Sequence, residues 1–320
     1  MNATAALAHS ITWAGSKQSY LTAWLLADRD LVDDCLRAYA YFRWADDLID
    51  VSNQTNPEKQ AFITRQKRLI ESLYEGNQPL DLCPEEEMLS ALIAHDRCPG
   101  SGLHSFILNF MRVIEFDSLR KGQMVTRVEL NTYTGWLATA VMDGIQYFIG
   151  NGSSYPKTAD RTLAVVGAHL VHMLRDTLDD LPSGIINIPS EDIMERNIHV
   201  EAVDSEPFRT WVRDQAEQAR ACLKMGKQYI DSLDNLRCKI AGIWYCCRFE
   251  WFLDAFKRDD YRLRKAYPDH QNLRAWVKMA NLGLKITLKH FLGRIKHISS
   301  HLGNRVAIGP ETSISSYRAK

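Results

Sequence analysis

Hydrophobic residues along the chain recur at helical spacing, and the alternation typical of strands is nearly absent. Apolar side chains three and four positions apart predict amphipathic helices, which are separated by short polar, proline-containing or glycine-containing breaks. The predicted helices cover residues 16–27, 31–50, 57–75, 85–94, 103–120, 127–149, 159–180, 206–233, 235–258 and 273–299. The pattern therefore predicts an all-α protein of about ten helices.

The breaks between these helices are too short to separate domains. The clearest turn cluster covers residues 150–156, and another break follows the helix that ends at residue 180. We find no internal repeat and no low-complexity linker, so residues 1–302 are expected to form a single helical domain. Residues 303–320 are polar and irregular, and we expect them to form a C-terminal tail.

Composition and charge exclude some classes of function. The chain of 320 residues is long enough to bury a sizeable core. It carries 39 basic and 39 acidic residues, so it has no overall attraction for nucleic acid. The apolar fraction of 46% is typical of a soluble globular protein. We expect a small-molecule substrate rather than a nucleic acid, and nothing in the sequence indicates an obligate protein partner.

Cysteine usage and hydropathy predict a cytoplasmic location. The seven cysteines lack the spacing of a metal site or a disulfide framework, so we expect free thiols in a reducing compartment. The N-terminus lacks the basic and apolar segments of a signal peptide. The best candidate for a membrane span, residues 240–256, is interrupted by Arg248, Glu250 and Asp254. Peripheral contact with a membrane is left open.

The first segment with chemical potential is residues 39–50 (YAYFRWADDLID). Tyr39, Arg43, Asp46 and Asp50 are spaced by three or four residues and would share one helix face. Carboxylates on a largely apolar helix are costly to bury unless a cation offsets them. Arg43 can do so in part, and Mg²⁺ fits better because it prefers carboxylates together with substrate phosphates. On this segment alone, a solvated acidic helix end is an alternative.

A second acidic helix indicates the chemistry. His169, His172, Asp176 and Asp180 follow the same spacing, and Arg175 stands beside the first aspartate. If the two helices face each other, their aspartates line an anionic cleft that holds a diphosphate only with a metal such as Mg²⁺ or Mn²⁺. Loss of diphosphate from an allylic carbon produces a carbocation, which aromatic side chains stabilise. The repeated pattern argues against two unrelated acidic helix ends.

These segments resemble the two aspartate-rich motifs of the squalene/phytoene synthase family. The first motif is residues 39–50 and the second is residues 174–180 (LRDTLDD). Ser16 and Lys17 ahead of the first motif, and Glu129-Leu130-x-x-Tyr133 in the central helix, support the resemblance, which covers residues 15–265. It implies an isoprenoid synthase helical bundle with a central cavity. It also implies Mg²⁺-dependent coupling of two allylic prenyl diphosphates, usually head-to-head through a cyclopropyl intermediate.

The resemblance also implies roles for individual residues. Arg43 and Arg175 would support the leaving diphosphate through charge-assisted hydrogen bonds. Tyr133 would face the reacting carbons. The residues expected to bind Mg²⁺ and diphosphate are Asp46, Asp50, Asp176 and Asp180. The remaining candidates for substrate binding are Ser16 and Lys17 at the mouth of the cavity, together with Tyr39, His169 and Asn187.

The chain departs from the family pattern in the half that would bind the acceptor. Family members usually carry Gln and Asn where this chain has His169 and His172. Two positions that are usually glycine are Thr139 and Met142, which suggests a shorter or reshaped cavity. The usual Arg-x-Tyr-x-Pro after the second motif is replaced by residues 185–189 (IINIP), and the C-terminal tyrosine falls near Phe249. The chain therefore resembles a divergent member, similar to the phytoene-synthase-like prenyltransferases.

The two histidines admit more than one interpretation. We expect them to hydrogen-bond the diphosphate or the acceptor, with His172 as a catalytic candidate, because a neutral imidazole can also accept a proton. Buried structural histidines are the alternative. A Zn²⁺ or Fe²⁺ site with Asp176 lacks an evident third ligand. Asp117, near the end of the helix over 103–120, is interpreted as helix-end charge.

Four functions are compatible with the sequence. They are head-to-head coupling of two isoprenoids, prenyl transfer to a non-prenyl acceptor such as an electron-rich aromatic ring, class I terpene cyclisation, and a non-catalytic assembly role. Retention of all four aspartates argues against the last. NADPH is not an expected cofactor, because the sequence contains no glycine-rich nucleotide-binding motif. The sequence does not exclude NADPH.

Overall fold

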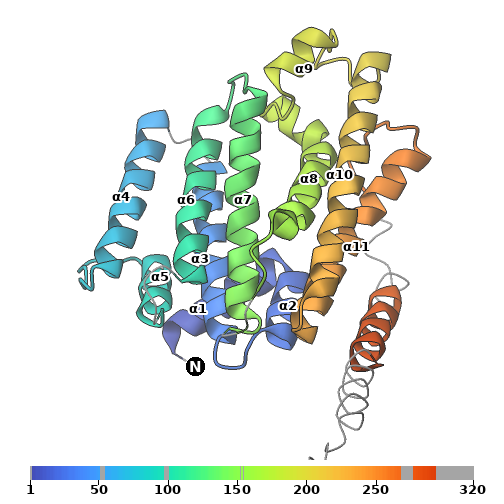
Figure 1. The fold of residues 1–320 in the computed structure, drawn as a ribbon. Helices are drawn as coiled ribbons and strands as arrows, with labels where there is room; N and C mark the ends of the chain where they lie inside the picture. The colour runs from blue at the N-terminus through green and yellow to red at the C-terminus, as the bar shows by residue number, and fades with distance from the viewer. Residues whose placement is uncertain are drawn as a thin grey trace, which may run out of the picture. The chain divides into compact units, whose positions relative to one another are not determined.

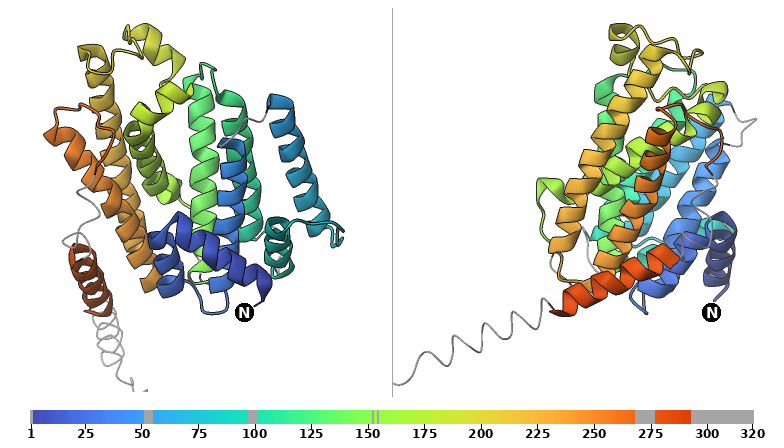
Figure 2. Two further views of the ribbon diagram at one scale, coloured as in Figure 1. Left: turned by 180° about the vertical axis from the view of Figure 1, so that it is seen from behind. Right: turned by 90° about the vertical axis from the view of Figure 1, so that its right-hand side faces the viewer.

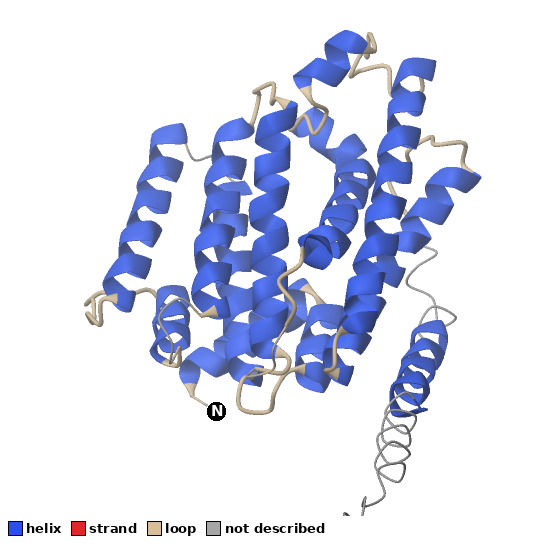
Figure 3. Ribbon diagram, viewed as in Figure 1, coloured by secondary structure: helices blue, strands red, loops and turns tan. Residues whose placement is uncertain are grey.

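The computed structural model describes residues 2–50, 55–96, 101–151, 153, 155–267 and 277–292. These residues form helices and connecting loops without a β-strand, which confirms the predicted all-α class (Figures 1 and 3). The elements are α1 (Ala3–Gly15), α2 (Lys17–Leu26), α3 (Val32–Asp50), α4 (Asn56–Tyr74), α5 (Pro84–Ala94), α6 (Gly102–Arg120), α7 (Arg127–Phe148), η1 (Ala159–Thr162), α8 (Leu163–Asp180), η2 (Leu181–Ser183), α9 (Ser190–Glu195), α10 (Glu206–Ser232) and α11 (Leu236–Arg258).

The chain divides into two compact units, Met1–Asn272 and Leu273–Lys320. Of the helix expected at 273–299, residues 277–292 are helical and the remainder lie outside the described residues. The expected boundary between residues 302 and 303 also lies outside them. No helix in the described segments is long and apolar enough to cross a membrane. The cysteines in these segments are free thiols, and Cys98 is not among them.

The long helices of the first unit are packed side by side. In Figure 1, α4, α6, α7 and α10 run in similar directions, and α8 lies between α7 and α10. In the reverse view of Figure 2 (left), α3 lies in front of α6 and α7, while α1, α2 and α5 lie at the lower end. This arrangement places the C-terminal ends of α3 and α6 and the N-terminal end of α7 at the same end of the bundle.

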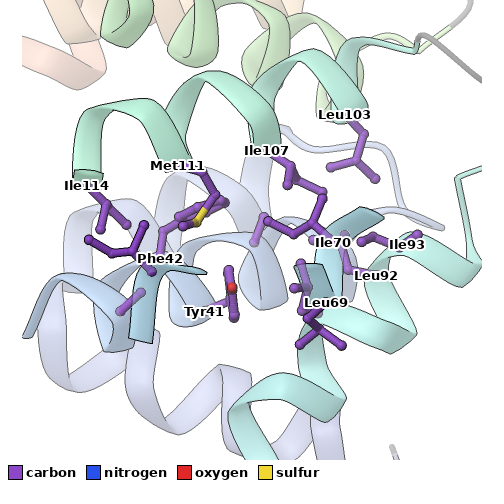
Figure 4. Packing of buried hydrophobic residues seen from close by; sticks show 14 of the residues in the cluster. Tyr41, Phe42, Leu69, Ile70, Leu92, Ile93, Leu103, Ile107, Met111 and Ile114 are labelled. Carbon is purple, nitrogen blue, oxygen red and sulfur yellow. The ribbon is translucent and has the colours of Figure 1, made fainter. Parts of the chain in front are cut away.

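A hydrophobic cluster fixes the orientation of α3. The helix buries the face that carries Tyr41, Phe42 and Ala45 against α4, α5 and α6, as Figure 4 shows for the first two. The hydroxyl of Tyr41 donates to Gln66 Oε1 at 2.8 Å, which satisfies the polar atom inside this core. Burial of each large side chain contributes about 1.5–3 kcal/mol. Because this face is buried, the face with Asp46 is directed elsewhere.

Close packing of α8 on α10 fixes the second motif helix. A Cβ atom added at Gly226 of α10 would lie 2.3 Å from the backbone nitrogen of Ala164 in α8. At Gly167 of α8 it would lie 2.8 Å from the carbonyl oxygen of Ala219 in α10. Both distances are shorter than a Cβ contact allows, so glycine at these positions lets the two helix backbones approach each other.

The segment after α8 is attached to the loop between α6 and α7. The backbone N–H of Gly122 donates to the carbonyl of Gly184 at 2.7 Å, and that of Ser190 donates to Val125 at 2.8 Å. Gly122 and Gly184 adopt φ angles of 73° and 79°, a region that favours glycine. The attachment holds the polypeptide that carries Asn187 against the end of the bundle where the motif helices terminate.

Candidate active site

Carboxylates from three helices converge at one end of the bundle. Burial raises the pKa of Asp46 to about 7, and repulsion from Asp50 and Asp117 adds to the effect. Burial likewise raises the pKa of Asp180 to about 6, with repulsion from Asp176 and smaller contributions from Asp117 and others. Asp117 on α6 therefore lies within electrostatic range of both motif helices. Asp50 is also an electrostatic neighbour of Asp117, and Asp176 is one of Asp180.

The arginines of the two motifs form different ion pairs. Arg43 pairs with Asp47 at 2.6 Å, and both side chains are half-exposed. Its guanidinium still lowers the pKa of Asp46, although Asp46 is not its ion-pair partner. Arg175 forms two contacts with Asp176, from Nε to Oδ1 at 2.5 Å and from Nη2 to Oδ2 at 2.7 Å. Both predicted arginines thus lie beside motif carboxylates.

The centre of the cleft contains a cation that the sequence interpretation missed. Nε of Arg120, on α6, lies 2.7 Å from Oδ1 of Asp117, and the Arg120 side chain is only 11% exposed. Arg120 also donates to Oδ1 of Asn187, whose Nδ2 donates to Asp180 at 2.8 Å. Asp117 accepts a hydrogen bond from the hydroxyl of Tyr133 at 3.0 Å. Asp117 is therefore a central residue of the site, and its interpretation as helix-end charge was wrong.

Aromatic rings surround this cation. The rings of Tyr133 and Phe116 are stacked with centroids 4.9 Å apart, and the guanidinium carbon of Arg120 lies 5.1 Å from the Tyr133 centroid. The ring of His169 packs edge-on against Tyr133 at 5.2 Å. Electron-rich faces therefore already stabilise a cation at this position, as they would stabilise a carbocation.

His169 and His172 are neutral. The pKa of each imidazole is lowered to about 3, mainly by burial. Repulsion from neighbouring cations contributes to this value, chiefly from Arg175 for His172. Nε2 of His169 is buried and has no hydrogen-bond partner within the described part of the chain. An unsatisfied buried nitrogen costs about 1–3 kcal/mol, so a ligand that pairs with it would gain affinity. The ring of His172 lies 4.9 Å from that of Phe249 on α11.

Ser16 and Tyr39 lie together near the first motif. Ser16 caps α2 by accepting the N–H of Ser19 at 3.1 Å, and its side chain interacts with the hydroxyl of Tyr39. Tyr39 is also an electrostatic neighbour of Arg43 and Asp46. Lys17 is exposed, and its ammonium group lies 5.6 Å from the ring centroid of Trp13.

The donor set fits a hard divalent cation. Mg²⁺ is usually bound by one or two carboxylates with substrate phosphates and water, and carboxylate oxygens are the ligands present. The pKa values of Asp46 and Asp180 are raised partly by repulsion from neighbouring aspartates, which a divalent ion would relieve. In the described segments, no group of three His, Cys, Asp or Glu side chains is placed to hold a metal ion by itself.

Deeper in the bundle, α7, α8, α10 and α11 enclose a narrow apolar pocket. Its free volume is about 20 Å³, and its lining includes Met142, Val165, Ile230 and Tyr245. Met142 occupies one of the positions where the family usually has glycine. That it shortens a substrate cavity stays a prediction.

Comparisons with known proteins show the family and the fold. The family model described as "Squalene/phytoene synthase" matches residues 13–276. The fold is similar to that of the squalene synthase HpnC from Alicyclobacillus acidocaldarius, with a TM-score of 0.65, 17% identity, and coverage of 82% of this chain and 95% of that one. It is also similar to TcSQS, solved with the ligand BPH1237, with a TM-score of 0.65, 13% identity, and coverage of 90% and 89%. No curated protein sequence matches the chain.

Proposed function

Because the chain belongs to the squalene/phytoene synthase family, we propose that it is a Mg²⁺-dependent prenyltransferase that ionises an allylic prenyl diphosphate. The observation that carries the proposal is the meeting of two Asp-x-x-x-Asp helices, α3 and α8, at one end of the bundle. Asp46 of α3 and Asp180 of α8 both lie within electrostatic range of Asp117 on α6, and both are partly buried. Such a group of negative charges requires cations, and a diphosphate can enter only with them.

The residues of the cleft have distinct roles in this proposal. Asp46, Asp50, Asp176 and Asp180 would hold Mg²⁺, which when bound neutralises the diphosphate and promotes its departure. Arg43 and Arg175 form charge-assisted hydrogen bonds to diphosphate oxygens. Tyr133, held by its bond to Asp117, presents its ring to the cation, and the neutral imidazole of His172 or His169 accepts the proton released when the new bond forms.

Coupling to a second isoprenoid is the acceptor chemistry that the family implies. A second candidate is transfer to a non-prenyl acceptor, such as an electron-rich aromatic ring. It is supported by the altered acceptor side, where His172 of α8 packs against Phe249 of α11 and has Arg248 as an electrostatic neighbour. Neither candidate requires a reductant if the reaction ends by loss of a proton.

The first test measures diphosphate release and extracted products from the full chain with Mg²⁺ and allylic diphosphates of increasing length. Ionisation predicts release with at least one substrate. A dimeric hydrocarbon would identify head-to-head coupling, whereas release only with an aromatic co-substrate would identify the second candidate. If no allylic diphosphate of any length is cleaved, the proposal is wrong.

Variants of the motif aspartates test the metal assignment. Asp46→Asn and Asp176→Asn each remove one negative charge from the cleft and should lower diphosphate release at least 100-fold, or about 2.7 kcal/mol of barrier. Asp33→Asn is the matched control, because Asp33 lies on the same helix as Asp46 but pairs with His9 at 3.0 Å outside the cleft. Release at the wild-type rate by an Asp46→Asn, Asp176→Asn double variant would refute the metal assignment.

A further inference from the structure

Arg248 on α11 is a partly buried cation without a carboxylate partner. Its Nε atom is fully buried and makes no hydrogen bond, and no ion pair to Arg248 occurs among the described residues. A buried charge is normally paired or hydrogen-bonded, because its desolvation costs several kcal/mol otherwise. Nothing in the fold explains this arginine as a structural ion pair, so a ligand is the simplest source of the missing anion.

Arg248 belongs to the acceptor side of the site. Its charged neighbours are Arg175 and Asp176 on α8, and its polar neighbours include Tyr39 of α3 and Tyr245. Arg175 also faces His172, as Arg248 does. The guanidinium group thus lies within electrostatic range of residues from both motif helices, α3 and α8.

The positive charge in this region exceeds the negative charge. Arg175 is already paired with Asp176 at 2.5 Å, so that pair is close to neutral. Arg248 adds one uncompensated charge, and repulsion by Arg175 together with burial lowers its pKa. The excess of one positive charge matches a ligand group with one negative charge.

Aromatic groups line the space next to Arg248. The ring centroid of Phe249 lies 5.8 Å from the guanidinium carbon, and the rings of Tyr245 and His172 each lie 4.9 Å from that of Phe249. His172 is neutral, so it adds no charge of its own. Rings of this kind pack against a planar aromatic molecule, and a guanidinium group binds a carboxylate through two parallel hydrogen bonds.

We propose that Arg248, next to Arg175, binds the carboxylate of an aromatic acid that serves as the prenyl acceptor, with Phe249, Tyr245 and His172 against its ring. The inference rests on the proposed ionisation of an allylic diphosphate and names the acceptor's chemical class. The balanced reaction breaks the allylic C–O bond, with both electrons leaving on the diphosphate. A π-electron pair of the aromatic ring forms the new C–C bond, and the ring then loses one proton to a neutral imidazole.

Calorimetric titration of the full chain tests the proposal. The protein is first saturated with Mg²⁺ and farnesyl thiolodiphosphate, an analogue that does not ionise appreciably, and is then titrated with 4-hydroxybenzoate or with its neutral counterpart 4-hydroxybenzamide. The acid should bind at least tenfold more tightly than the amide. Arg248→Met should weaken binding of the acid at least tenfold and change binding of the amide less than twofold. Arg112→Met, on the exposed side of α6, is the control and should change neither.

Thermal unfolding supplies a second measurement that does not depend on turnover. Arg248→Met should raise the Tm of the unliganded protein, because it removes an unpaired buried charge, and 4-hydroxybenzoate should raise the Tm of the wild type but not of the variant. A lower Tm in Arg248→Met would indicate a structural role and overturn the proposal.

Three further results would also overturn it. The first is equal affinity of the wild type for the acid and the amide, and the second is no saturable binding of the acid to the wild type. The third is that the wild type binds two equivalents of the thiolodiphosphate whereas Arg248→Met binds only one. The last would place a second prenyl diphosphate at Arg248. A wild type that cleaves no allylic diphosphate would refute the proposed function, whereas the binding comparison would still decide whether Arg248 holds a carboxylate.

Discussion

The two histidines of α8 are held neutral by their surroundings. His169 is buried between Tyr133 and the cation of Arg120, and the charged neighbours of His172 are Arg175 and Arg248. Protonation of either ring would add a positive charge beside an existing one, in a place with little water. Both imidazoles are therefore unprotonated across the physiological pH range.

This neutrality makes stability depend on pH. The folded pKa of each histidine, about 3, lies below the ordinary value of 6.5, so between these values the unfolded chain binds protons that the folded chain does not. The contribution is fully present above pH 6.5 and is lost as the pH falls toward 3, by about 2 kcal/mol per histidine at pH 5. His169→Gln together with His172→Asn should therefore lose less stability than the wild type between pH 7.5 and pH 5.

Urea unfolding of both proteins at the two pH values measures this difference. The raised pKa values of the cleft aspartates make stability increase as the pH falls, which is opposite to the effect of the histidines. Both proteins contain these aspartates, so their contribution cancels in the comparison. Parallel loss of stability in the two proteins would show that the imidazoles are protonated in the folded state.

At the residue scale, the sequence predicts side chains whose signal is local. Asp46 and Asp50 share a helix face with Arg43 by spacing alone, and the structure places them at the site. Asp117 was missed because its partner Tyr133 lies 16 positions away, and no periodicity connects them. Arg248 is visible in the sequence only as one of three charged residues, with Glu250 and Asp254, within residues 240–256, and only the fold shows that it forms no ion pair among the described residues.

Among the elements, α8 has the least freedom to move. Its glycine contacts with α10 leave no room for a methyl group, and its C-terminal end continues into the segment that Gly122 holds. A displacement of α8 would move Asp176, Asp180 and both histidines together. The packing of α8 on α10 therefore sets the width of the cleft.

Gly226→Ala tests this packing. The added Cβ would lie 2.3 Å from a backbone atom of Ala164, so the helices must separate, and the free energy of unfolding should fall by about 3 kcal/mol. Gly135→Ala on α7 is the matched control, because no atom lies within 4 Å of the position that its new methyl group would occupy. It should stabilise the protein by about 0.5–1 kcal/mol through helix propensity. Similar effects at both sites, measured by denaturant unfolding, would contradict the close approach.

Most α-helices were predicted as elements, and two were not. The helices that contain the motifs agree with the expected ranges because their apolar positions repeat over several turns. The exceptions are α1, which is 13 residues long and which Asn2 caps by accepting the N–H of Ala5 at 3.0 Å, and α9, which is six residues long. Six residues give too few positions to show a period, and the alanine-rich sequence of α1 is only weakly amphipathic.

On the scale of the whole molecule, the candidate site belongs to a single unit. Every residue proposed to bind metal, diphosphate or acceptor lies between Ser16 and Phe249, within the unit Met1–Asn272. The family match over residues 13–276 covers nearly the same part of the chain. The chemistry therefore requires no residue from Leu273–Lys320.

A chain that ends at Asn272 tests this conclusion. It should fold and release diphosphate from the same allylic substrates as the full chain, with kcat within about threefold, since all proposed ligands are present. Circular dichroism and a diphosphate assay provide the two readouts. A folded but inactive shortened chain would show that the second unit contributes to the site.

Arg120 gives the cleft an unusual property. Its guanidinium lies among the carboxylates of α6 and α8, but unlike a dissolved ion it is attached to the backbone and cannot be diluted or removed by a chelator. The local concentration of this cation is fixed by the length of its side chain. A metal ion that binds near Asp180 would therefore replace the guanidinium of Arg120, which is attached to the backbone, with an ion that diffuses freely. Metal affinity should consequently vary less with ionic strength than the number of aspartates alone would suggest.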